Sequence, residues 1–389
     1  MVAKAAIHDK TQRVLCELPW MAAFAAMTKY GDTGYKTMTK ARSNYIPVVH
    51  GAVDDRPDEA DTVEAALAIS ETLRGLGYQS DLVHVGLDMT PIEDMAQRKP
   101  LAVFNLVEAI NADFRLQPMA PAIYERLRIP YTGCSFDAIV SAMSKTRSKH
   151  VMKAAAIATP AWIDGIRNPL PFDTMVLVKS DSEHASIGID SSSVVMAGEA
   201  QRVIREREKS FGGRFFAEVF IEGREFNVAL VEGPGGPLAL PIPEIQFIDY
   251  PEGKPRIVDY DAKWMVESFA YNNTPRAFGI EKEDPKLARK LKKMALDVWR
   301  AFGLSGYARV DFRVDAFGKP WAIDVNTNPC ITPDAGFATT ASEAGISYPQ
   351  LIERIVNAAL PVADAVEDSD RLSAEMTETS EVSAPAGAW

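Results

Sequence analysis

Cysteines, long apolar runs and basic clusters are all scarce in this sequence. Its 389 residues include three cysteines, Cys16, Cys134 and Cys330, and their odd number and wide spacing suggest neither a disulfide framework nor a zinc motif. Such cysteine usage is typical of a reducing compartment, so we expect a cytoplasmic protein. The longest early apolar stretch, residues 18–27, is about half of the roughly 20 residues that a membrane-spanning helix needs, and no secretory signal precedes it. We therefore expect no membrane partner.

The charge balance argues against a nucleic-acid partner. The formal net charge is −11, and no run of Lys and Arg of the kind that binds a phosphate backbone is present. A negative protein can still bind a nucleotide if a few cations are concentrated in one cleft and a metal ion supplies the rest. The apolar content of 47% and charged content of 24% are those of a globular protein with a sizeable core.

The length and the pattern of the chain predict several units. Short apolar runs alternate with helical patterns over residues 44–133, which predicts an N-terminal parallel α/β domain. The other predicted parts are an N-terminal extension (1–43), a central subdomain (134–222), a C-terminal subdomain (223–362) and a disordered polar tail (363–389).

One helix in the N-terminal part has clear start and stop signals. Asp61 and Glu64 have the spacing of a capping box, which predicts that the helix begins at Asp61. Its predicted core face includes Leu67 and Leu73, and Gly77 is predicted to end it.

The strongest chemical signal is a predicted β-hairpin in residues 306–329. Arg309 and Asp311 share one face of the first strand, because side chains alternate faces along a strand. Asp324 and Asn326 likewise share one face of the second strand. The hairpin would place two carboxylates, an amide oxygen and a guanidinium in one patch, which suits Mg²⁺ bound to nucleotide phosphates. The alternative is a solvent-facing hairpin, although Asp and Asn are poor strand formers.

Three lysines at strand ends and loop edges could contact phosphate oxygens: Lys145, Lys179 and Lys263. Each of them alone is more often an exposed surface lysine. The polar run 180–188 after Lys179 could fold over phosphates and donate backbone N–H groups, although a single glycine makes this a weak signal.

Residues 215–226 contain an apolar strand, a polar turn with Gly223 and a second strand. Backbone groups along 218–221 could contact a purine edge, and Glu225 could accept hydrogen bonds from ribose hydroxyls. The alternative is a plain β-hairpin in which Glu218 and Glu225 lie on the surface.

Taken in order, these segments resemble the D-alanine–D-alanine ligase branch of the ATP-grasp family. The collinear segments are FN (104–105), RIPYTGC (128–134), SK (144–145), AIATP (156–160), VK (178–179), AEVFIEGREF (217–226), DYDAKW (259–264), GYARVDF (306–312) and DVNTNPC (324–330). The resemblance covers about residues 100–360 and extends more loosely to residue 44. It implies an α/β (α+β) protein with the ATP-grasp fold, in which a parallel α/β domain precedes two subdomains that enclose ATP.

The resemblance also implies roles for individual residues. Those implied to bind ATP are Lys145, Lys179, Ser186, Glu218, Val219 (by its backbone), Ile221, Glu225 and Lys263. Those implied to bind two Mg²⁺ ions, for which Mn²⁺ is expected to substitute, are Asp311, Asp324 and Asn326. Arg309 and Lys263 would act in catalysis, with Arg309 stabilising the tetrahedral intermediate.

The implied reaction joins two amino-acid-like small molecules. A carboxylate attacks the γ-phosphate of ATP, and a free amine attacks the resulting acyl phosphate to give an amide, ADP and phosphate. We therefore expect an ADP-forming, ATP-dependent carboxylate–amine ligase, and the resemblance favours a homodimer.

The amino-acid half departs from the family pattern. In the stretch after Asn105, Glu108 or Asp113 could hold a substrate ammonium, but a helix-cap role is equally compatible. Trp264 stands where the family has Tyr, and Cys330 stands where it has Gly, which narrows the room for an acceptor.

Ala335 replaces a Ser that would contact the acceptor carboxylate. Asp334 beside it would repel that carboxylate if it faced inward, and would favour an amine or a cationic acceptor.

Three functions remain compatible with the sequence. The first is a ligase with a substrate pair of its own, the second is a D-alanine–D-alanine ligase of cell-wall synthesis, and the third is a non-catalytic ATP-binding sensor. Arg309 argues against the third, because a sensor has no need of a transition-state arginine.

Overall fold

Three short apolar segments form a parallel sheet near the start of the described chain. The computed structural model describes residues 43–51, 57–163, 170–183 and 185–361. Strand β1 (Val48–His50) lies between β2 (Leu82–His84) and β3 (Phe104–Leu106), with parallel pairing on both sides. The predicted parallel arrangement is therefore confirmed. The predicted extension, apart from Ser43, and the predicted tail lie outside the described residues.

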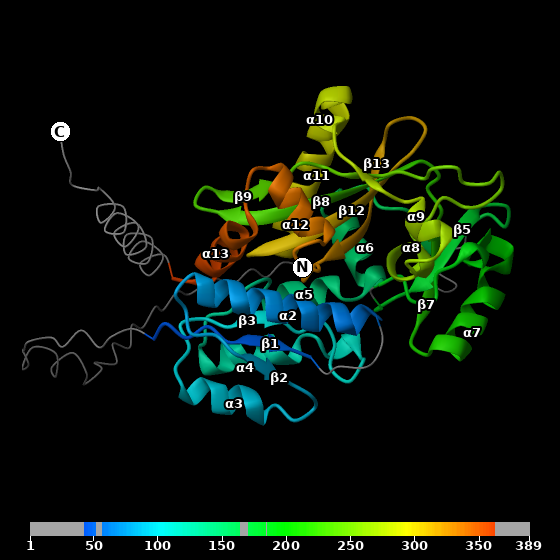
Figure 1. Ribbon diagram of the computed structural model, residues 1–389. Helices are drawn as coiled ribbons and strands as arrows, with labels where there is room; N and C mark the ends of the chain where they lie inside the picture. Colours follow the sequence, from blue (N-terminus) through cyan, green and yellow to red (C-terminus); the bar gives the residue numbers. More distant parts are fainter. Residues whose placement is uncertain (1–42, 52–56, 164–169, 184, 362–389) are drawn as a thin grey trace, which may run out of the picture. The chain divides into compact units, whose positions relative to one another are not determined.

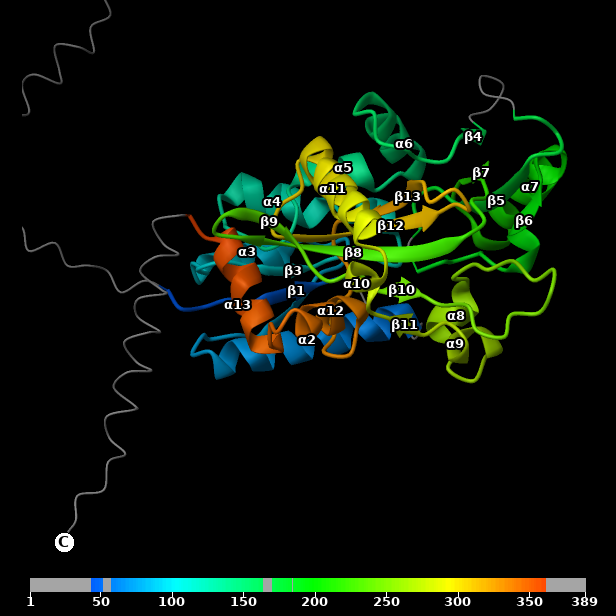
Figure 2. The same ribbon diagram turned by 90° about the horizontal axis from the view of Figure 1, so that it is seen from above.

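Helices cover both faces of this sheet (Figures 1 and 2). Helices α3 (Thr90–Gln97) and α4 (Met119–Leu127) share one apolar core with the sheet, and the short helix η1 (Phe114–Leu116) precedes α4. Helix α2 (Pro57–Gly75) belongs to the core on the other face.

The predicted start of α2 is wrong. The helix begins at Pro57, four residues before Asp61, because proline is well suited to the first helical turn. Asp61 is therefore inside the helix and does not cap it. Leu73 is fully buried, but Leu67 is 53% exposed, so its predicted core position is also wrong. The helix ends at Gly75, two residues before the predicted Gly77.

The central part contains an antiparallel sheet with the strand order β4-β7-β5-β6. Its strands are β4 (Trp162–Ile163), β5 (Met175–Ser180), β6 (Val194–Met196) and β7 (Phe215–Val219). Helix α7 (Ala200–Phe211) packs on one face, and η2 (Ser191–Ser193) and η3 (Ala197–Glu199) flank β6. Helices α5 (Phe136–Ala142) and α6 (Lys145–Ala154) precede this sheet in the sequence.

A third sheet provides the largest core. Its order is β11-β10-β8-β12-β13, with β9 paired to β8. The strands are β8 (Arg224–Gly233), β9 (Gly236–Ala239), β10 (Glu244–Ile245), β11 (Arg276–Ala277), β12 (Tyr307–Val314) and β13 (Pro320–Asn326). Because β12 and β13 pair directly, the predicted hairpin is confirmed.

The two faces of the third sheet have different neighbours. Phe226 and Val310 face a core shared with α5, α6 and α11 (Pro285–Phe302). Val231 and Tyr307 face a core shared with α2, α12 (Gly336–Glu343) and α13 (Tyr348–Ala359), and Figures 1 and 2 show α13 beside α2. The remaining helices are α8 (Tyr260–Trp264), α9 (Phe269–Asn272) and α10 (Ile280–Glu283). The domain boundaries at residues 133 and 222 stay predictions.

Strands β7 and β8 do not form the plain hairpin that the sequence allowed. They belong to different sheets, so the segment between them crosses from one sheet to the other. Gly223 in this segment has a φ of 146°, and a β-carbon there would lie 2.0 Å from the carbonyl oxygen of Val314. Only glycine allows this close approach.

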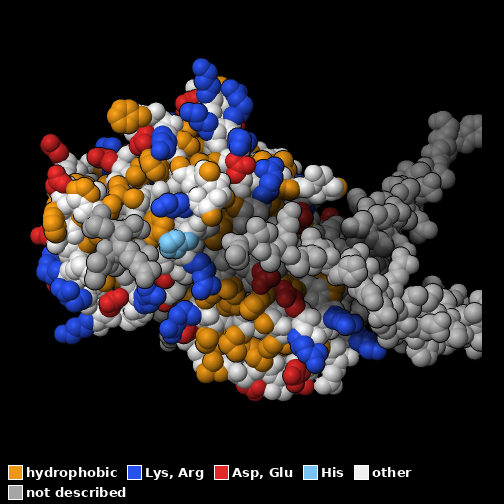
Figure 3. All heavy atoms as spheres, turned by 180° about the vertical axis from the view of Figure 1, so that it is seen from behind, with side chains coloured by type: hydrophobic (Ala, Val, Ile, Leu, Met, Phe, Trp, Pro, Cys, Tyr) orange, Lys and Arg blue, Asp and Glu red, His pale blue; other side chains and the backbone are white. Residues whose placement is uncertain are grey.

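Charged side chains are interspersed with apolar ones on the face shown in Figure 3. Within the described ranges, no helix is long and apolar enough to cross a membrane.

We expect Gly223→Ala to lower the midpoint of urea unfolding. The substituted residue would keep a left-handed φ and clash with Val314, and such strain costs on the order of 1–3 kcal/mol. Gly235→Ala in the β8–β9 turn is the matched control, because a β-carbon there meets nothing within 4 Å. Equal midpoints for the two variants would show that the crossing does not depend on Gly223.

Candidate active site

The β12–β13 hairpin brings the predicted metal ligands together. Asp311 lies opposite Asp324, and Arg309 lies opposite Asn326. Arg309 donates from Nε and Nη2 to the two Asp311 oxygens, at 2.8 and 2.9 Å. Asn227 of β8 donates to Asp311 Oδ1 at 2.7 Å. These contacts hold the Asp311 carboxylate on the strand face that the alternation predicted.

The donor set suits a divalent cation shared with a nucleotide. Two carboxylates and an amide oxygen are hard ligands, and Mg²⁺ is usually bound by one or two carboxylates together with substrate phosphates. Within the described ranges, no group of three or more His, Cys, Asp and Glu side chains forms a metal cage of its own. Asp311, Asp324 and Asn326 therefore fit a metal that phosphates help to hold.

Arg309 and Lys263 provide positive charge beside these ligands. Burial alone would lower the pKa of Arg309, but the adjacent Asp311 carboxylate outweighs burial and raises it. Burial, followed by the charge of Arg309, lowers the pKa of Lys263. Arg309 therefore stays cationic throughout the physiological range.

Three buried lysines converge on two carboxylates. Lys145 Nζ lies 3.4 Å from Asp324 Oδ2, and Lys179 Nζ lies 2.7 Å from Glu218 Oε1. Lys149 contacts the other carboxylate oxygen of Glu218. Lys149 and Glu218 are 1% and 2% exposed, so this ion cluster is screened from water.

The start of α6 explains the position of Lys145. Asp181, which follows β5, accepts hydrogen bonds from Ser144 Oγ at 2.9 Å and from the Thr146 N–H at 2.9 Å. The Lys145 N–H donates to the Asp181 carbonyl oxygen at 2.8 Å. These contacts fix the first turn of α6 at the end of β5, next to Lys179.

Lys149 was missed by the sequence reasoning. It lies one helical turn after Lys145, so the two side chains are on the same face of α6. This spacing of four residues could have predicted that Lys149 lies beside Lys145. Burial alone would raise the pKa of Glu218, but Lys149 and Lys179 hold it below its usual range.

Two of the predicted nucleoside residues, Ile221 and Glu225, contact a buried arginine. Glu225 Oε2 is 2.8 Å from Arg313 Nη1, and Arg313 Nε donates to the carbonyl oxygen of Ile221 at 2.9 Å. Arg313 follows a bulge in β12, and its burial was not predicted. The N–H of Val219 donates to the Ala161 carbonyl oxygen at 2.7 Å, so a purine contact through Val219 would have to use its carbonyl group.

The loop that contains Ser186 is docked onto the segment that carries Lys263. Ser186 Oγ donates to the Val258 carbonyl oxygen at 2.9 Å, and Trp264 Nε1 donates to the Ala185 carbonyl oxygen at 3.0 Å. Ala185 and Ser186 both have a φ of 61°, a left-handed conformation that costs energy in non-glycine residues. This docking joins the loop to α8 and to the segment before it.

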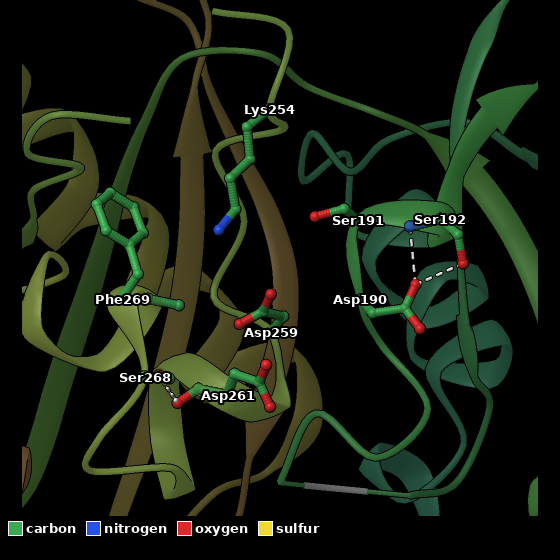
Figure 4. A pocket seen from close by; sticks show the side chains of 9 residues that line it. Asp190, Ser191, Ser192, Lys254, Asp259, Asp261, Ser268 and Phe269 are labelled. Carbon is green, nitrogen blue, oxygen red and sulfur yellow. Dashed lines mark hydrogen bonds between the residues drawn. The ribbon is translucent and has the colours of Figure 1, made fainter. Parts of the chain in front are cut away.

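A cavity of about 470 Å³ lies outside this docked loop (Figure 4). Its lining includes Asp190, Ser191 and Ser192 on one side and Lys254, Asp259 and Phe269 on the other. It shares no residue with the predicted ATP and metal ligands. We place the chemistry at the buried lysines and the hairpin, because the lysines and carboxylates there approach one another closely.

Cys330 and Asp334, two of the predicted substrate residues, lie in the loop that follows β13. Cys330 Sγ is 3.4 Å from Thr332 Oγ1, and Asp61 of α2 is a charged neighbour of Cys330. Burial and the charge of Asp61 raise the pKa of Cys330. Asp334 is exposed.

The loop after β3 approaches the same end. Glu108 is half-buried and close enough to Tyr307 for its charge to add to the effect of burial, and together they raise the pKa of Tyr307. Asp113 caps η1 by accepting from the Arg115 N–H, so the cap role holds for Asp113.

Known proteins share both sequence and fold with this chain. Residues 152–357 match the family model "D-ala D-ala ligase C-terminus". The chain is 32% identical over 299 residues to a D-alanine–D-alanine ligase of Laribacter hongkongensis, covering 74% of this chain and 90% of the relative. It is 28% identical over 303 residues to that of Methylococcus capsulatus, covering 76% and 90%. The crystal structure of the Bacillus anthracis ligase complexed with ATP has a TM-score of 0.63 and 21% identity, covering 83% of this chain and 99% of that one.

The fold is thus that of the ATP-grasp ligases, enzymes that form ADP while they join a carboxylate to an amine. The D-alanine–D-alanine ligases among them act on small amino acids with ATP and a divalent metal ion. The chain belongs to the D-alanine–D-alanine ligase family.

We expect Lys149→Met to destabilise the fold. It would leave Glu218 buried with one lysine, and removal of one partner from a buried ion cluster costs about 3–5 kcal/mol. Thermal unfolding at pH 7 would measure the loss, and Lys153→Met on the exposed side of α6 is the control. An unfolding temperature equal to that of the control would contradict the importance of the Lys149–Glu218 contact.

The difference between Lys149→Met and the wild type also has a predicted pH dependence. The lowered pKa of Glu218 contributes stability above the unfolded-state pKa of about 4.3, and this contribution is lost as the pH falls through the folded-state pKa. The difference in unfolding temperature should therefore shrink below about pH 4.

Proposed function

We propose that this ligase uses its buried lysines and the hairpin patch to join a pair of amino-acid-like substrates other than two molecules of D-alanine. The proposal is carried by one observation. The charged groups of the ATP-binding half converge as the chemistry needs, whereas the residues around Cys330 at the amino-acid end differ from the family pattern.

The ATP phosphates would lie among Lys145, Lys179 and Lys263, with Ser186 in the covering loop. Asp311, Asp324 and Asn326 would hold two Mg²⁺ ions, with Mn²⁺ able to substitute, and the bound metal would neutralise charge on the phosphates. The adenine would contact Glu218, Val219 and Ile221, and the ribose would contact Glu225.

The first chemical step brings two anions together. A carboxylate oxygen of the first substrate attacks the γ-phosphorus, and the bond to the ADP oxygen breaks. At about 4 Å and an effective dielectric near 20, each lysine–phosphate contact would offset on the order of 4 kcal/mol of this repulsion. Since Lys145 and Lys179 are already held in place, little reorganisation is needed.

The second step forms the amide. The amine nitrogen of the second substrate attacks the acyl carbon, and phosphate leaves. Negative charge develops on the carbonyl oxygen, and the Arg309 guanidinium, held by Asp311, would stabilise it. The docked loop at Ser186 would exclude water that could hydrolyse the acyl phosphate.

The substrate pair is proposed from the altered end of the site. The Cys330 thiol occupies space that a glycine would leave open, and it lies 3.4 Å from Thr332 Oγ1. Ala335 offers no hydroxyl to an acceptor. Glu108 is a candidate for the ammonium group of a substrate. We further propose a cytoplasmic homodimer without a nucleic-acid or membrane partner.

A screen of ADP release over pairs of D- and L-amino acids and small amines tests this proposal. We expect another pair to exceed D-alanine alone at millimolar concentration, because the acceptor space is narrower. Turnover with D-alanine equal to or above every other pair would contradict the proposed specificity.

Asp324→Asn is the control for this screen. It keeps the size of the side chain but removes the charge of a metal ligand, so we expect ADP release to be abolished with every pair while the far-ultraviolet circular dichroism is unchanged. Near-wild-type ADP release with saturating Mg²⁺ would mean that the metal site is elsewhere.

A further inference from the structure

An arginine that the sequence did not single out lies at the altered end of the site. Arg276 begins β11, the edge strand of the third sheet, and pairs with Ile245 of β10. It is far in sequence from the hairpin and from the loop after β13. Its guanidinium nevertheless lies against Gly336, the first residue of α12.

The missing side chain at Gly336 makes this approach feasible. A β-carbon on Gly336 would lie 2.8 Å from Arg276 Nε, 3.1 Å from Cζ and 3.2 Å from Nη2. The guanidinium thus occupies the space that a larger residue at position 336 would fill. Gly336 directly follows Ala335. Ala335 is the residue that replaces a Ser whose hydroxyl would contact the carboxylate of the acceptor.

Arg276 is an exposed residue of β11, and its charged group has no partner in the part of the chain that the structure describes. Among the described residues, its guanidinium makes no hydrogen bond or ion pair. Its charged neighbours are Arg309 and the exposed Asp334. Desolvation, followed by the charge of Arg309, lowers the pKa of Arg276, and the charge of Arg309 has a larger effect than that of Asp334. A further anion would therefore stabilise the two arginines.

A guanidinium without a protein partner is suited to an anionic ligand. Within the described ranges the hydrogen-bonding groups of Arg276 are unused, and a guanidinium binds carboxylates in a bidentate geometry.

We propose that Arg276 binds the carboxylate of the acceptor substrate, in place of a hydroxyl at position 335. The acceptor is then an amino acid with a free carboxylate and not a simple amine. This inference rests on the proposed function, because it assigns an acceptor to that reaction. Arg276 acts in binding, so its loss should raise the acceptor KM and leave kcat and the ATP KM nearly unchanged.

The test compares acceptors that differ only in the carboxylate. Wild type and Arg276→Gln are assayed for ADP release with D-alanine against D-alaninamide and with L-alanine against L-alaninamide, each with the best donor held at saturation. We expect the wild type to prefer the free acids. Arg276→Gln should raise the KM for the acids by about tenfold to a hundredfold and remove the preference.

Two further variants separate binding from structure. Arg289→Gln removes a similar charge from an exposed position on α11 and should behave as wild type. Gly336→Ala keeps Arg276 but places a methyl group where the guanidinium lies, so it should reproduce part of the rise in acceptor KM. An unchanged acceptor KM in Arg276→Gln, or a wild type that accepts the amides equally well, would overturn the proposal.

Failure of the proposed function can be distinguished from failure of this inference. If no pair gives turnover, calorimetric titration of D- and L-alanine and their amides is carried out in the presence of ADP and Mg²⁺. Binding of the acids that Arg276→Gln weakens would support the carboxylate site although the reaction proposal had failed. Equal binding by both proteins, or no binding of the acids, would overturn the site as well.

Discussion

The arrangement of the buried lysines depends on one buried carboxylate, that of Glu218, held between Lys149 and Lys179. This ion cluster joins α6 to β5 and β7, and it fixes the helix whose first residue is Lys145. Lys179 also donates to the carbonyl oxygen of Ile323 at 3.0 Å, which links the central sheet to β13 beside Asp324. A buried carboxylate with two cationic partners tolerates little displacement, because a lost partner leaves an uncompensated charge. The lysines are therefore positioned before any nucleotide arrives.

The two ends of the site consequently differ in how firmly neighbouring residues hold their side chains in place. At the proposed ATP end, several charged groups have partners that fix them: Asp311 holds Arg309, Arg313 holds Glu225, and Glu218 holds Lys149 and Lys179. At the amino-acid end, Cys330 and Ala335 change the space and the donors. Preorganised charge serves a phosphoryl transfer that the family shares, whereas specificity is set by a few side chains around the acceptor.

Much of this could be predicted from the sequence where the signal was local. The alternation in residues 306–329 placed Arg309 with Asp311, and the hairpin then placed Asp324 opposite. The predicted start of α2 was less reliable, because the helix begins at Pro57 and not at the capping box predicted at Asp61. Gly223 was expected in a turn between two strands of one hairpin, whereas it lies in a crossing between two sheets. Both structures require glycine at this position, so the residue type alone does not distinguish them. Arg313 and Arg276 could not be found, since Arg313 pairs with Glu225 of β8 and Arg276 lies against Gly336 of α12, both distant in the sequence.

The central claim is that the carboxylate of one substrate is activated as an acyl phosphate in this cleft. It is tested most directly by oxygen transfer, with the carboxylate of the first substrate labelled with ¹⁸O. We expect the inorganic phosphate released with ADP to carry one labelled oxygen, because the attacking oxygen leaves with phosphorus when the amine adds. Unlabelled phosphate, or release of AMP and pyrophosphate, would contradict the claim.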